Sequence, residues 1–260
     1  MKLLKLFGSK LNSFLFSNLL LIVFLILWQV LPQIGVLKET YTSTPTKVLL
    51  SIITLQENGE LKVHLLISLK RIMFGLILAI IVAVPLGLFI GRIKLLEALL
   101  DSFLQIFRQI SALALFPVFI LFFGIGETSK VAIIFWASLW PILINTISGV
   151  KDVNPLYVKS VLTMGSGKFV AFIKVILPAS IPSILTGVKL GSAYAVMVLV
   201  AAEMIGAQSG LGFLVNNSQE TFNTSLMYGA IVLLSILGIV LNFILTFLEG
   251  KLVFWRKFDA

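Results

Sequence analysis

Six long apolar segments limit what this chain can fold into. They occupy residues 14–33, 65–90, 99–123, 129–150, 178–206 and 226–249. A helix needs about twenty apolar residues to cross the hydrocarbon core of a bilayer, and each segment has roughly that length. Only 12% of the residues are charged, whereas a soluble domain has about 25%. We therefore predict an all-α integral membrane protein with six transmembrane helices.

The first segment, 14–33, follows three lysines, as the apolar core of a signal peptide would. No small-residue cleavage site follows it, and it ends in Trp28 and Pro32. We therefore expect an uncleaved transmembrane helix.

Lysine and arginine are distributed unevenly among the intervals between these segments. Six crossings put both termini on one side of the membrane. The intervals on that side carry Lys2, Lys5, Lys10, Arg92, Lys94, Lys151, Lys159, Lys168, Lys174, Lys251, Arg256 and Lys257. The opposite intervals carry only Lys38, Lys47, Lys62 and Lys130. Because cytoplasmic loops are enriched in Lys and Arg, we expect cytoplasmic N- and C-termini. Orientation in the lipid bilayer thus explains the net charge of +9, and the basic residues form no stripe for nucleic acid.

A polar, basic stretch at residues 159–182 separates two of the apolar segments. Asn154-Pro155 before it favours a helix start. Gly165 and Gly167 permit a tight turn, after which apolar residues recur at helical spacing until Leu177-Pro178 and Pro182 break the pattern. We expect two short helices joined by a glycine turn, packed against a partner protein in the cytoplasm.

The spacing in this stretch resembles the "EAA" loop of ABC-importer permeases. In that family a glycine precedes the proline of a Leu-Pro pair by thirteen residues, as Gly165 precedes Pro178 here, and Lys-Ser-Val at 159–161 stands in place of Glu-Ala-Ala. The resemblance implies a cytoplasmic coupling helix in loop 152–176 that sits in a groove of an ATP-hydrolysing subunit. The positions that it implies for ATPase coupling are Lys159, Gly165, Ser166, Gly167, Lys168, Phe169, Leu177 and Pro178.

Other segments resemble the nitrate/sulfonate/taurine branch of these permeases. Residues 101–126, DSFLQIFRQISALALFPVFILFFGIG, are similar to the third-helix signature of the branch. The matching residues there are Arg108, Pro117, Phe123, Gly124 and Gly126, with Gln109 and Ser111 where the branch has prolines. The end of the branch's fifth helix is similar to Ala202-Glu203 followed by Gly210-Leu211-Gly212. The start of its second helix is matched by His64, Ser68-Leu69 and Arg71.

The resemblance implies the type I ABC-importer (MetI-like) permease fold, as a single domain over residues 1–260 with outer loops at 34–62 and 207–225. It also implies the partners: a second permease copy in a homodimer, two ATP-binding cassette ATPase subunits, and a periplasmic or lipid-anchored substrate-binding protein. The implied substrate is a small anion such as nitrate, a sulfonate or taurine. The same branch also serves vitamin precursors and flavins, which stay alternatives.

The two outer loops carry their own helix signals. The first loop contains an apolar run at 48–55, with Thr44-Pro45 before it and Asn58-Gly59 after it. This pattern predicts a short interfacial helix. The interval 207–225 fits either a re-entrant turn or a short outer helix.

Polar residues inside apolar segments are candidates for the substrate pathway, since a charge within a bilayer is costly and usually functional. Arg108 would face the pore or snorkel to the inner surface. Lys189 would line the pore or form an interhelical hydrogen bond or ion pair. Glu203, about 21 Å further along the same helix face, would mark a second depth of one pathway or act as a gate or helix-pair hydrogen bond. Asn145 and Ser192 would line the path or bridge helices.

Small residues at fixed spacing predict close helix packing. Gly87-x-x-x-Gly91 and Gly187-x-x-x-Gly191 both fit that role.

The residue inventory argues against catalysis by this chain. Ser166-Gly167-Lys168 is similar to part of a nucleotide-binding P-loop, but Leu162 and Phe169 occupy the positions where that motif needs Gly and Ser or Thr. There is no cysteine and one histidine, His64, so we predict no cofactor, no metal site and no Ser/His/Asp set. We expect a transport subunit whose partner hydrolyses ATP. A secondary transporter, the main rival, should show internal repeats, and none is visible.

Overall fold

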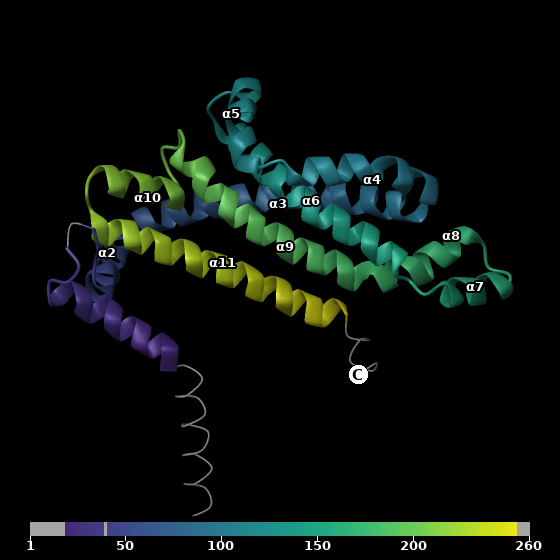
Figure 1. The fold of residues 1–260 in the computed structure, drawn as a ribbon, viewed down its shortest axis with the longest axis horizontal. Helices are drawn as coiled ribbons and strands as arrows, with labels where there is room; N and C mark the ends of the chain where they lie inside the picture. The colour runs from purple at the N-terminus through teal and green to yellow at the C-terminus, as the bar shows by residue number, and fades with distance from the viewer. Residues whose placement is uncertain (1–18, 39–40, 254–260) are drawn as a thin grey trace, which may run out of the picture. The chain divides into compact units, whose positions relative to one another are not determined.

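The computed structural model describes residues 19–38 and 41–253, which form helices joined by turns, without a β-strand among them (Figure 1). An apolar helix covers Leu19–Gln33. The helices that follow are α2 (Pro45–Glu57), α3 (Glu60–Arg92), α4 (Lys94–Gln109), α5 (Ala112–Phe123), α6 (Glu127–Lys151), α7 (Pro155–Thr163), α8 (Lys168–Ala171), a π-helical turn (Phe172–Ile176), α9 (Leu177–Met204), α10 (Leu211–Glu220) and α11 (Thr224–Leu252).

Four helical stretches in the described residues are long and apolar enough to cross a membrane. They are α3, α6, Lys168–Met204 and α11, and they correspond to the expected spans 65–90, 129–150, 178–206 and 226–249. The first expected span appears as the shorter helix Leu19–Gln33, and its residues 14–18 lie outside the described part. The all-helical membrane character is therefore confirmed, with four spans, or five if one bent helix pair counts as a span.

The expectation of one continuous helix over 99–123 is wrong. The segment is divided into α4 and α5, and the pair is bent by 91°. Ile110 and Ser111 at the break have extended backbone, with ψ of 121° and 119°. The charged residues of α4 recur at helical spacing, which makes it amphipathic rather than apolar throughout. The remaining 12 residues of α5 reach about 18 Å, too short for a crossing.

The expected helix break at Leu177-Pro178 and Pro182 is also wrong. Helical structure continues from Lys168 to Met204. In the π-helical turn, the Leu177 N–H donates to the Phe172 carbonyl oxygen five residues earlier. Because Pro178 has no N–H for the usual carbonyl four residues back, the wider turn carries the helix past it.

The chain groups into two compact units, and the first comprises residues up to 62 together with 214–232. Within it, α2 begins at the cap residue Thr44, whose Oγ1 accepts a hydrogen bond from the Lys47 N–H at 3.4 Å. It ends just before Gly59, which has a φ of 74°. The Ser51 hydroxyl donates to the Ser225 carbonyl oxygen at 3.0 Å. The short helix expected in the outer loop 34–62 is therefore present. The interval 207–225 likewise takes its helical alternative, as α10.

The second unit, residues 63–213 and 233 onward, is built around α6. The glycines of α3 and α9 bring their backbones close to it. A Cβ added at Gly87 would lie 2.6 Å from the Cβ of Thr146, and one at Gly187 would lie 2.8 Å from a side-chain atom of α6. The Ser138 hydroxyl donates to the Gly191 carbonyl oxygen at 3.1 Å. Both small-residue motifs are therefore contacts with α6, as predicted.

Gly87→Ala should destabilise the protein by about 1–3 kcal/mol, because the added methyl group overpacks the contact between α3 and α6. The matched control is Gly238→Ala in α11, where an added Cβ would meet only a Val196 side-chain atom at 3.8 Å. That change should be neutral or slightly stabilising, since alanine favours helix more than glycine does. Thermal unfolding of both variants in lipid nanodiscs measures the difference, and equal midpoints would contradict the proposed contact.

Candidate functional site

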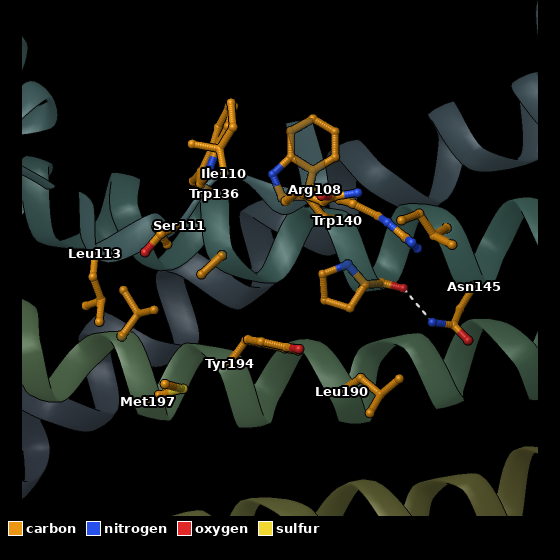
Figure 2. Close-up of a pocket in the computed structure, with 16 residues that line it drawn as sticks. Arg108, Ile110, Ser111, Leu113, Trp136, Trp140, Asn145, Leu190, Tyr194 and Met197 are labelled. Atoms are coloured by element: carbon orange, nitrogen blue, oxygen red, sulfur yellow. Dashed lines mark hydrogen bonds between the residues drawn. The ribbon is translucent and has the colours of Figure 1, made fainter. Parts of the chain in front are cut away.

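A cavity of ≈ 490 Å³ opens in the second unit beside the break between α4 and α5. Residues 108–113, which include the two extended residues of the break, form one side of it. The other sides come from α6 and α9, and Figure 2 shows the α9 side chains facing those of α6. The labelled residues on these two helices are Trp136, Trp140, Asn145, Leu190, Tyr194 and Met197. The structure thus brings Arg108 and Asn145, two expected pathway residues, to one cavity.

Arg108 gives this cavity its charge. The side chain is exposed at the last turn of α4 and forms no ion pair or hydrogen bond with any residue that the structure describes. Asn145 donates from Nδ2 to the Pro141 carbonyl oxygen at 2.8 Å, which fixes its amide at the wall. No carboxylate lies among the residues that line the cavity. The guanidinium keeps its N–H donors available at the cavity, and no lining carboxylate competes for them, so the arrangement suits an anion.

Two other expected pathway residues lie elsewhere. Lys189 of α9 forms an ion pair with Glu249 of α11, and both side chains are partly buried. Ser192 is buried and donates to the Lys189 carbonyl oxygen at 2.8 Å. Neither lines the cavity beside α4 and α5. Lys189 therefore forms the interhelical ion pair that was one of its two expected roles. Ser192 forms its hydrogen bond within its own helix.

Glu203, the fifth expected pathway residue, is fully buried at the end of α9. Its carboxylate accepts hydrogen bonds from Ser68 Oγ at 2.8 Å, from Arg71 Nη1 at 2.7 Å and from the Gly212 N–H at 2.8 Å. A buried charge is tolerated only when it is paired and its remaining lone pairs are bonded. Glu203 meets both conditions, so its place is in helix–helix bonding between α3 and α9.

Arg71 extends this network to α6. Its side chain is 3% exposed, and its Nε and Nη2 donate to the two carboxylate oxygens of Glu127 at 2.7 and 2.5 Å. The Nη1 also donates to the Ser209 carbonyl oxygen at 2.7 Å. Paired bonds of this kind fix both distance and orientation. We call Ser68, Arg71 and Glu203 the buried clamp; Glu127, whose side chain is 65% exposed, bonds to it from the outside.

The buried clamp also holds the connection between α9 and α10. The Leu211 N–H donates to Ser68 Oγ at 2.8 Å, and the neighbouring Gly210 N–H donates to His64 Nδ1 at 3.0 Å. Gly210 has a φ of 125°, and a Cβ there would collide with the Glu203 carboxylate. Glycine is therefore required at this position by both backbone conformation and space.

Sequence reasoning gave Arg71 and Glu127 no role. Arg71 lies inside the expected span 65–90, so the cost of a charge in an apolar segment marks it as it marks Arg108 and Lys189. Glu127 carries no such signal, because its partner is 56 residues away in the sequence. Nothing in local spacing indicates that pairing.

The loop 152–176 contains the expected first short helix, α7, and the glycine turn, but the expected second short helix is the start of the long helical stretch from Lys168 to Met204. Asn154 caps α7, accepting the Leu156 N–H at 2.9 Å. The turn contains Gly165 at a φ of 82°, and α8 follows. The expected coupling residues Lys159, Gly165, Gly167, Lys168 and Phe169 are exposed, whereas Ser166, Leu177 and Pro178 are half-buried.

Glu203→Gln should destabilise the protein by about 3–5 kcal/mol, because it leaves the buried Arg71 without one of its two charged partners. It should also speed amide hydrogen exchange at Leu211 and Gly212, whose N–H groups bond to Ser68 and Glu203. Glu249→Gln is the matched control: its ion pair with Lys189 is partly exposed and should contribute less than about 1 kcal/mol. Similar losses for both variants would contradict the assigned role of the buried clamp.

Comparison with known proteins identifies the family. The model for the binding-protein-dependent transport system inner membrane component matches residues 75–254. A putative ABC transporter permease protein of Methanocaldococcus jannaschii is 39% identical over 200 residues, which are 76% of this chain and 75% of that protein. A putative aliphatic sulfonates transport permease protein of Bacillus subtilis is 32% identical over 250 residues, covering 96% and 91% of the two chains. The taurine transport system permease protein of Escherichia coli is 31% identical over 241 residues, covering 91% and 88%.

The family model covers more than half of the chain, and the relatives align over most of their length. The match includes the break between α4 and α5, the loop 152–176 and all of α11. The chain therefore belongs to the binding-protein-dependent transport system inner membrane components, as an ABC-importer permease of the nitrate/sulfonate/taurine branch.

Proposed function

We propose that two copies of this permease subunit enclose the substrate pathway, and that each copy binds one separate ATPase subunit through loop 152–176. A binding protein delivers the substrate on the opposite side of the membrane. ATP binding favours one of two conformations of the assembly, and the loop transmits that preference to the transmembrane helices.

The observation that carries the proposal is a set of exposed apolar side chains in the loop. Leu156, Tyr157, Met164 and Phe169 are 65%, 62%, 82% and 75% exposed. Lysines at 151, 159, 168 and 174 are interspersed with them, and such a basic interval does not enter the hydrocarbon core. Apolar side chains that neither the fold nor the lipid covers support a protein partner.

The same lysines support a cytoplasmic position for the loop. Cytoplasmic segments of membrane proteins are enriched in Lys and Arg, and the interval 207–225 has neither. An ATPase that uses cytoplasmic ATP would therefore meet the loop, and the binding protein would meet the side of α10.

The substrate that we propose is a small organic or inorganic anion. Relatives named for aliphatic sulfonates and for taurine align over nearly the whole chain. Arg108 supports an anion independently, because it brings a cation without a carboxylate partner to the cavity.

Truncating Phe169 and Met164 to alanine together should lower the amount of ATPase that copurifies with the permease by at least about tenfold. Large apolar side chains at an interface centre contribute about 2 kcal/mol or more each. The matched control is Phe243→Ala in α11, which removes a phenylalanine that is 70% exposed but lies outside the loop.

The measurement is pull-down of the partner ATP-binding cassette subunit co-expressed with this chain, followed by ATPase activity in nanodiscs. The control should retain wild-type binding. Undiminished binding by the loop variant would contradict the proposed docking surface.

A further inference from the structure

We propose that the cavity beside α4 and α5 binds an anion that carries one oxyanion head group on an apolar body, such as an alkanesulfonate. The proposal rests on the proposed transport function and adds to it a site, a charge partner and a preference among the anions of this branch.

The head-group end of the site is set by Arg108. A guanidinium binds planar or tetrahedral oxyanions with two N–H groups at once. The N–H groups of Arg108 form no hydrogen bond with a described residue. Arg108 lines the same cavity as the Asn145 amide and the Tyr194 side chain (Figure 2). These groups supply donors in addition to the charge.

The rest of the wall is apolar. Leu113, Trp136, Leu190 and Met197 line it together with other aliphatic residues. A volume of ≈ 490 Å³ lies in the range of about 300–1,000 Å³ for small-molecule sites, which are mostly apolar with a few placed polar groups. Nitrate would fill little of this space and would leave the apolar wall without a partner.

Because no carboxylate lines the cavity, an ammonium group has no ion-pair partner there. Taurine carries an ammonium group as well as a sulfonate. Its sulfonate could pair with Arg108, but its ammonium group would have no carboxylate partner in the cavity. The lining therefore favours an organic anion without a positive group over a zwitterion of similar size.

The break in the backbone supports a ligand site independently of the side chains. Extended residues within a membrane protein are tolerated where they line a cavity rather than face lipid. Ile110 and Ser111 have that conformation, and both line this cavity. In other transporters, interrupted helices mark substrate sites for the same reason.

A fluorescence titration on the full-length chain in nanodiscs tests the proposal directly. Replacing Trp28 and Trp255 by phenylalanine leaves Trp136 and Trp140 as the reporters. We expect saturable quenching by 1-pentanesulfonate, at least about tenfold weaker binding of taurine and nitrate, and no binding of pentylammonium, which has the same chain and the opposite charge.

In the same background, Arg108→Gln should weaken 1-pentanesulfonate binding by about 10- to 100-fold, as expected for the loss of a charge-assisted hydrogen bond. Arg108→Lys should retain part of the affinity. Arg92→Gln is the matched control, because Arg92 lies over the Phe172 ring at 5.9 Å and outside the cavity. It should bind like the wild type.

Several results would overturn the site: no saturable binding by the starting protein, equal binding of pentylammonium, binding of nitrate as tight as that of pentanesulfonate, or an unchanged affinity in Arg108→Gln. Because the titration needs no ATPase, its outcome is separate from the docking experiment. Failure here with an intact ATPase complex would refute the cavity alone. Success here without ATPase binding would refute the proposed coupling alone.

Discussion

The cost of placing a charge among apolar helices accounts for the most specific contacts of this structure. Arg71 of α3 is neutralised by Glu203 of α9 and Glu127 of α6, and Lys189 of α9 is paired with Glu249 of α11. Each pair joins different helices, so compensating a charge also fixes which helices are neighbours. A buried charge that loses its partner cannot recover that energy from water. For the fully enclosed pair of Arg71 and Glu203, the constraint is therefore severe.

Glycine contacts around α6 bring the helices into close packing, in addition to the ion pairs between them. Gly87 and Gly187 let α3 and α9 approach α6 until their backbones are nearly in contact, and dispersion forces over such surfaces replace the hydrophobic effect inside a bilayer. Of this packed set, α6 and α9 form one side of the cavity. The broken pair α4 and α5 supplies the other side, together with Arg108, whose counter-charge is not among the described residues.

Hydropathy predicted the four long spans because each is apolar on average despite its few charges. Gly165 and Asn154 predicted the turn and the cap of loop 152–176. Hydropathy could not predict the division of 99–123, since amphipathic α4 and apolar α5 average to one apolar segment and neither glycine nor proline lies at 110–111. Pro178 was misjudged because a π-helical turn absorbs its missing N–H. Arg108 and Asn145 could be named as candidates from the sequence, but their meeting at one cavity depends on helix packing. The pairing of Arg71 with Glu127 depends on it as well.

The charges of Arg71, Glu203, Lys189 and Glu249 are paired between helices, whereas Arg108 is left for the substrate. The most direct measurement is a cryo-electron microscopy structure of the importer, assembled with its ATPase and an alkanesulfonate. We expect sulfonate density within hydrogen-bond distance of the Arg108 guanidinium, with the alkyl chain against Trp136. This expectation would be contradicted if Arg108 were instead paired with a carboxylate of the second copy or of another subunit, with the ligand bound elsewhere.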